Sequence, residues 1–196
     1  MTSQFATFWR LGVGHIADLR GYDHILFIVA LTAGYRIGEW RQLVWLVTAF
    51  TLGHSLTLAL ATLDVIRVRA GIIEVLIAVT IVVSAVYALL DVSRTRASRS
   101  LRVPYAMAGA FGLIHGLGFS TFLRSALGME ESIALPLFAF NVGLEVGQLL
   151  IVLSVLLAGA VVVDVLGLAR RWWVGALSLA IAVAGVAMLV DRVSRA

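Results

Sequence analysis

The chain has 196 residues, of which 61% are hydrophobic and 13% are charged, and its mean hydropathy is +1.03. This composition excludes an ordinary soluble domain, which needs more charged surface, and predicts an integral membrane protein. The absence of cysteine excludes disulfides, thiolate metal sites and cysteine nucleophiles. The net charge is +4 and every basic residue is Arg. Because these residues lie in short connecting segments, we interpret them as a topology signal and expect no nucleic-acid partner.

The N-terminal region is predicted to lie ahead of the first membrane span. Its first twenty residues hold no long apolar run, so we expect no cleavable signal peptide. Residues 5–19 are predicted to form an amphipathic or half-buried segment in contact with the membrane. Three glycines disfavour a helix there, namely Gly12, Gly14 and Gly21.

Six apolar stretches follow that are long enough, or nearly so, to cross about 30 Å of hydrocarbon. They lie at 23–40, 42–63, 70–90, 104–126, 134–163 and 171–190. The first is short, since Arg36 and Glu39 crowd its end. The sequence therefore predicts an all-α membrane protein with a single transmembrane domain, 1–196, of six helices, one of them short.

Two features indicate how these helices pack and how they are oriented. Gly112 and Gly116 are one helical turn apart, as are Gly143 and Gly147, which predicts tight helix contacts in the fourth and fifth spans. The connection 91–104 reads DVSRTRASRSLRVP and is rich in Arg, so the positive-inside rule predicts that it is cytoplasmic. With six spans, both termini then lie outside a plasma or inner membrane that the chain crosses several times.

Ionisable side chains occur in or beside the predicted spans. They include all four histidines, and the set is His15, His24, His54, His115, Asp23, Glu74 and Glu145. Asn141 and Gln148 lie at i−4 and i+3 from Glu145 and share its helical face. At a rise of about 1.5 Å per residue, these groups fall in one half of the bilayer, down to its midplane, although they come from spans of alternating direction.

A bound cation would explain this segregation. Each ionisable side chain at membrane depth costs about 2.5–3.5 kcal/mol. Two nearby carboxylates also repel each other unless a cation lies between them, and a divalent ion would leave the imidazoles neutral. We predict a metal site in the outer half of the bilayer with the ligands His24, His54, His115, Glu145, Glu74 and Asp23. The residues predicted to surround these ligands are Asn141, Gln148, Ser55 and His15.

Plainer interpretations of single residues stay open. A membrane histidine can bond a neighbouring carbonyl group, Asp23 can cap a helix, and Glu74 can reach water from a span end. A mid-span carboxylate such as Glu145 is functional by default. The predicted ligands offer nitrogen and oxygen without sulfur, which suits Ni²⁺, Zn²⁺, Fe²⁺, Mn²⁺ or Co²⁺ and argues against Cu⁺.

Several segments resemble the HupE/UreJ family of small membrane proteins. They read GHIADLRGYDHILFIVAL, FTLGHSLTLALA, FGLIHGLGFS and FNVGLEVGQL, together with the span that opens with Glu74. The match is to the second, less characterised branch, because Ala17 stands where the nickel-permease branch has a His. The resemblance implies a role in nickel supply to hydrogenase or urease, as a permease. It also implies functional roles for Asp23 and His24 and for His54, Glu74, His115 and Glu145.

Three functions remain open at this stage. The first is a permease for a nickel-like divalent cation. The second is an intramembrane metal-dependent hydrolase with Glu74 or Glu145 as general base, although no HExxH or GxSxG motif is present. The third is a metal-free, proton-coupled carrier. The expected partners are a metal ion and the lipid bilayer, and a homo-oligomer stays open.

Overall fold

The computed structural model describes residues 2–19, 21–92, 100–127 and 132–195. Within these ranges every regular element is helical and no strand is present, which confirms the predicted all-α class. The helices are α1 (Thr2–Ile16), α2 (Asp23–Thr32), α3 (Trp40–Thr62), α4 (Ala70–Asp91), α5 (Arg102–Gly118), α6 (Ser120–Leu127), α7 (Ala134–Gly159) and α8 (Arg170–Arg195). A 3₁₀ turn at Ile37–Glu39 precedes α3, and a π-helical segment, Ala160–Val165, extends α7.

In the described part of the chain, four helical stretches are long and apolar enough to cross a membrane: Ile37–Thr62, Ala70–Asp91, Ala134–Val165 and Arg170–Arg195. The pair α5 and α6 adds a fifth if it is one span, bent by 52° at its break. The chain is therefore a multi-pass membrane protein. Residues 93–99, which carry most of the arginines behind the predicted orientation, lie outside the described ranges.

The predicted short first span contains only the ten-residue helix α2. Its helical part is about 15 Å long, half the hydrocarbon thickness. The Arg192 side chain nevertheless bonds both to Asp23, at the start of α2, and to the Glu74 carbonyl oxygen of α4. The start of α2 therefore lies at the level of Glu74. Leu31 and the following Tyr35 line a small cavity together with Asp91, near the other end of α4. The short helix and the residues after it thus run along most of α4.

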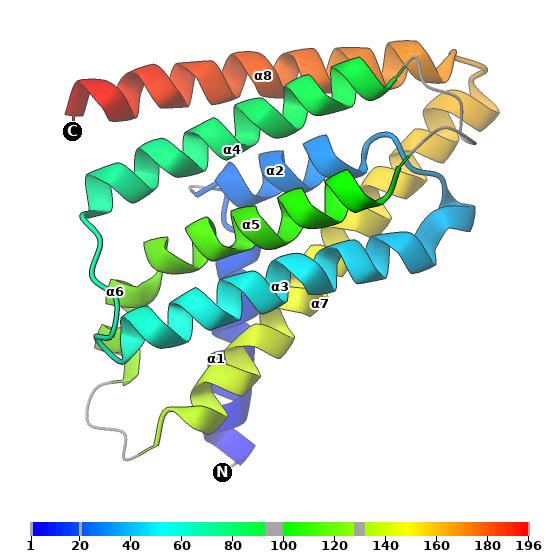
Figure 1. The fold of residues 1–196 in the computed structure, drawn as a ribbon. Helices are drawn as coiled ribbons and strands as arrows, with labels where there is room; N and C mark the ends of the chain where they lie inside the picture. Colours follow the sequence, from blue (N-terminus) through cyan, green and yellow to red (C-terminus); the bar gives the residue numbers. More distant parts are fainter. Residues whose placement is uncertain (1, 20, 93–99, 128–131, 196) are drawn as a thin grey trace.

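The helices are arranged as closely packed pairs. Figure 1 shows α4 beside α8, α3 beside α5, and α1 along the first half of α7, while α2 packs against α4 and α7. The α3–α5 pair is held by backbone contact: a Cβ atom on Gly112 would run into the Phe50 carbonyl oxygen, and one on Gly116 into that of His54. This confirms the tight contacts predicted for the fourth span.

The α1–α7 pair uses glycine in the same way. A Cβ atom on Gly12 would run into the Phe140 carbonyl oxygen, and one on Gly143 into that of Trp9. The glycines of the N-terminal segment are expected to disfavour a helix there. The helix α1 is nevertheless continuous from Thr2 to Ile16. Gly12 costs helix propensity but permits backbone contact with α7, and that packing stabilises the helix. The half-buried segment is therefore a docked helix.

Candidate metal centre

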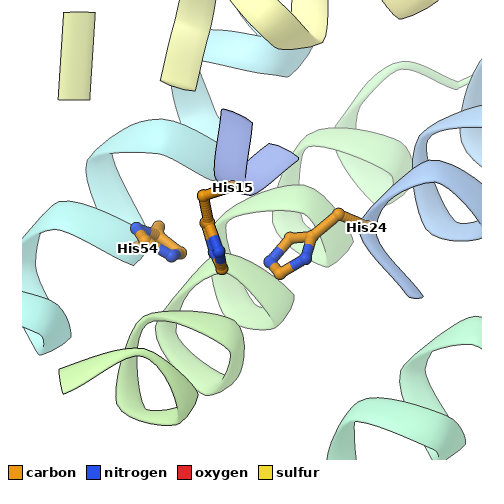
Figure 2. A group of neighbouring side chains, drawn as sticks. All are labelled: His15, His24 and His54. Carbon is orange, nitrogen blue, oxygen red and sulfur yellow. The ribbon is translucent and has the colours of Figure 1, made fainter. Parts of the chain in front are cut away.

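Three histidines from three helices converge on one small volume. His15 is near the C-terminal end of α1, His24 is in the first turn of α2, and His54 is fully buried in α3. One ring nitrogen from each lies within 4.8 Å of the others, and Figure 2 shows the three rings facing a common space. The ring centroids are 4.7 Å apart for His15 and His24, and 6.1 Å apart for His15 and His54. We call these three residues the histidine cluster.

His115 lies directly beside the cluster. Its ring centroid is 4.8 Å from that of His24, and its side chain is almost completely buried. It is not among the described residues whose ligand atoms meet within 4.8 Å, so it adjoins the group of three and is not one of its members. The backbone contact between α3 and α5 brings His54 and His115 to the same level of the fold.

Hydrogen bonds fix the proton position on two of these rings. The Nδ1 atom of His24 is 3.0 Å from the Asp23 Oδ1 atom, so it donates to that carboxylate and leaves Nε2 as an acceptor. The Thr80 hydroxyl donates its single proton to the Ile77 carbonyl oxygen at 2.7 Å. The His115 Nε2 atom, 3.0 Å from the same hydroxyl, must then carry its own proton. Each ring therefore exposes one bare lone pair.

These bare nitrogens have no partner within the described part of the fold. The buried atoms without a hydrogen bond include the Nε2 atoms of His15 and His24, both ring nitrogens of His54, and Nδ1 of His115. A buried polar atom without a partner is costly, and several such atoms at one place make this group a candidate site for a ligand that accepts their lone pairs. Neutral imidazole nitrogen is the commonest protein ligand of transition metals.

An aromatic wall surrounds the histidine cluster. The Phe119 ring centroid is 3.8 Å from that of His15, and Phe140 stacks at 6.4 Å from His54. Phe50 lies within 6.3 Å of His24 and packs against Phe27 at 5.1 Å. These rings keep the site apolar, which strengthens any interaction between the imidazoles and a cation.

Asp23 lies behind His24 rather than inside the cluster. Its Oδ1 atom accepts hydrogen bonds from both the backbone N–H and the ring of His24, at 2.9 and 3.0 Å. Its Oδ2 atom accepts from Arg192 of α8 at 3.2 Å. A carboxylate in this position orients a ligating imidazole and raises its basicity.

The other predicted site residues lie elsewhere. The Glu74 side chain is exposed on α4, and its carbonyl oxygen accepts a hydrogen bond from Arg192. Glu145 and Gln148 bond to Thr48 and Thr51 of α3, at 2.6 and 2.9 Å. Asn141 and Ser55 donate to carbonyl oxygens of their own helices. In the described residues, the group able to hold a metal is thus composed of histidine alone.

Sequence reasoning placed His15 only among the surrounding residues, whereas the structure brings it into the group of three. The signal that could have found it is Gly12, one turn earlier on the same helix. A glycine that permits backbone contact with α7 shows that α1 enters the bundle and delivers His15 to its interior.

The fold and the site together define a multi-pass membrane protein with a buried histidine cluster between its helices. The chain belongs to the HupE / UreJ family, since the model of that family described as "HupE / UreJ protein" matches residues 1–192. No curated protein and no solved structure gives a significant match.

Proposed function

We propose that this protein is a permease for a divalent transition metal, which it binds at His15, His24 and His54. The observation that carries the proposal is the approach of one ring nitrogen from each histidine to within 4.8 Å of the others, in a group whose buried nitrogens include several without a hydrogen-bond partner in the described fold. Imidazole ligands suit nickel, zinc and iron among divalent ions. The family resemblance favours nickel among these.

The charge of the site supports transport rather than storage. Among the described residues, no carboxylate joins the histidine cluster as a ligand, and the nearby Asp23 is already paired with Arg192. A divalent ion bound by neutral imidazoles alone keeps its full positive charge in an apolar region. This uncompensated charge costs free energy, and a conducted ion must be able to leave its site.

The predicted orientation fits uptake. Helix α4 runs from the level of Glu74, next to Arg192 and Asp23, to Asp91 at the start of the Arg-rich connection. If that connection is cytoplasmic, the histidine cluster lies toward the outer side, with both termini outside. An ion would then meet the cluster first and move inward.

A second candidate is a metal-dependent hydrolase of the membrane. The feature that favours it is the set of three histidine ligands, which leaves a coordination position for water, as in catalytic zinc sites. Against it, Glu145 bonds to Thr48 and Glu74 is exposed, so neither carboxylate stands beside the cluster as a general base.

The test is metal content and uptake with purified protein. Wild type in proteoliposomes is expected to bind Ni²⁺, Co²⁺ or Zn²⁺ and to accumulate it, and His54→Ala is expected to lose both properties. Ser154→Ala on the exposed face of α7 is the matched control. Metal bound without any accumulation would favour the hydrolase, and protein that binds no metal would favour a proton-coupled carrier.

A further inference from the structure

Glu145 is a mid-helix carboxylate with no cationic partner among the residues that the structure describes. It lies half-buried in α7, and its Oε1 atom accepts a hydrogen bond from the Thr48 hydroxyl at 2.6 Å. No described residue makes an ion pair with it. A carboxylate within a membrane helix is costly and marks an ion or proton pathway by default. It does not belong to the histidine cluster, so it needs a function of its own.

A second polar pair lies between Glu145 and the cluster. The Thr51 hydroxyl donates to the Gln148 amide oxygen at 2.9 Å, and both side chains are buried. Thr48, Thr51 and His54 follow one another at three-residue spacing, so they lie along one face of α3. At about 1.5 Å of rise per residue, each step along this face is about 4.5 Å.

The seam between α3 and α7 therefore carries a continuous row of polar groups. It begins at the buried imidazole of His54 and passes the Thr51–Gln148 pair to the Thr48–Glu145 pair. From His54 the row runs toward the start of α3 at Trp40. It leads away from the end of α3 at Thr62 and from the turn at Asp64 that follows. A row of this kind is what an ion needs to move on from the histidine cluster.

We propose that Glu145, Thr48, Thr51 and Gln148 form a second cation site, in series with the histidine cluster, that receives a partly hydrated divalent metal ion. This proposal rests on the proposed permease function. Oxygen ligands hold late transition metals less tightly than imidazoles do. The carboxylate supplies the negative charge that the histidine cluster lacks. An ion thus passes from a nitrogen site to a weaker, charge-compensating oxygen site, and several weak sites in a row favour conduction.

The first experiment measures binding alone, by equilibrium dialysis of Co²⁺ against the purified full-length chain. Wild type is expected to bind one equivalent tightly and a second one weakly. Glu145→Gln is expected to weaken the second equivalent about tenfold or more, since even indirect partners of a metal change affinity by 10–100-fold. The same substitution is expected to leave the tightly bound equivalent of Co²⁺ in place. His54→Ala is expected to lose the tight equivalent.

The second experiment measures Co²⁺ uptake into proteoliposomes. Glu145→Gln is expected to slow uptake about tenfold while tight binding persists, and Thr48→Val, which removes the hydroxyl donor but keeps the side-chain shape, is expected to slow it less. Ser154→Ala, an exposed hydroxyl of the same helix, should equal wild type. A monodisperse elution profile and an unchanged melting temperature show that each variant is folded.

Several results would overturn the second site. A wild type that binds a single equivalent leaves the histidine cluster standing but removes the Glu145 site, as does a Glu145→Gln variant that still binds two. Loss of the tight equivalent in Glu145→Gln would place Glu145 in the cluster itself. If uptake in that variant changes only in its pH dependence and the stoichiometry does not, the occupant is a proton. A wild type that binds no Co²⁺ refutes the proposed function and this inference together.

Discussion

The guanidinium of Arg192 donates a hydrogen bond to the carboxylate of Asp23 at 3.2 Å, although the two residues are 169 positions apart. A second nitrogen of the same side chain donates to the Glu74 carbonyl oxygen at 2.8 Å. The last turn of α8 thereby holds the start of α2 and the first turns of α4 together. Because Asp23 in turn bonds the His24 ring, the C-terminal helix supports the geometry of the histidine cluster.

The first prediction concerns Asp23. Asp23→Asn removes the charge behind His24 and allows its ring to change tautomer, so Co²⁺ affinity should fall about 10–100-fold. Isothermal titration with the purified protein measures this. Asp191→Asn is the control, because Asp191 pairs with Arg195 at an exposed position. Equal affinities in the Asp23→Asn variant and wild type would show that Asp23 does not position His24.

The second prediction concerns Arg192. Arg192→Gln removes two charge-assisted hydrogen bonds, each worth about 1.5–3 kcal/mol of stability. We expect a clearly lower melting temperature in detergent and a smaller loss of metal affinity than in Asp23→Asn. Arg195→Gln, which removes an exposed ion pair one turn away, should leave both quantities near wild type. If the two variants melt alike, the Arg192 contacts contribute nothing to stability.

The third prediction tests the docking of α1. In Gly12→Ala the new methyl group would meet the Phe140 carbonyl oxygen, so α1 must move away from α7 and take His15 with it. The expected result is a loss of metal affinity as well as of thermal stability. Gly14→Ala is the matched control on the same helix, since nothing lies within 4 Å of its new Cβ atom. That variant should gain up to about 1 kcal/mol from helix propensity.

The fourth prediction ranks the histidines. His15 belongs to the group whose nitrogens meet within 4.8 Å, whereas His115 adjoins it. His15→Ala should therefore reduce Co²⁺ affinity more than His115→Ala does, as measured by the visible absorption of bound Co²⁺. The reverse order would mean that His115, and not His15, completes the ligand set.

The fifth prediction concerns pH and lies outside the membrane spans. Hydrogen bonding to Arg67, and then to Arg124, lowers the pKa of the Asp64 carboxyl from 3.8 to about 2. A carboxyl with a lowered folded-state pKa stabilises the protein above pH 4 and loses this contribution as the pH falls toward 2. Asp64→Asn should thus lower the melting temperature at pH 7, and the difference should shrink in acid. Asn suits the site, since it tolerates the positive φ of 64° found there.

Much of the fold could be predicted because long apolar runs in a sequence identify membrane helices. The four long spans and the bent pair α5–α6 overlap the predicted ranges, and each extends past its range by a few residues. The ten-residue length of α2 could not be read in the same way: the predicted span runs to residue 40, whereas the helix ends at Thr32. Apolar composition measures solubility in lipid, but it does not determine where helical hydrogen bonding stops.

The candidate site was predictable in part for a similar reason. A rise of about 1.5 Å per residue gives the depth of a side chain, and it put His54 and Glu145 at nearly the same level. Depth says nothing about the rotation of one helix against another. That rotation turns Glu145 toward Thr48, about two turns from His54, and Gln148 toward Thr51, about one turn from His54. The histidines could therefore be named as a group, but the separation of the carboxylate from them required the packed structure.

The contact of α1 with α7 also has a consequence for biosynthesis. α1 leaves the ribosome first, yet the groove that Gly12 fits is formed by Phe140 and Leu144, which are translated after most of the bundle. Until α7 is inserted, His15 has no place to dock, so the histidine cluster is complete only when that helix arrives. Under the proposed function, a nascent chain arrested before that point is expected to bind no metal at the histidine cluster.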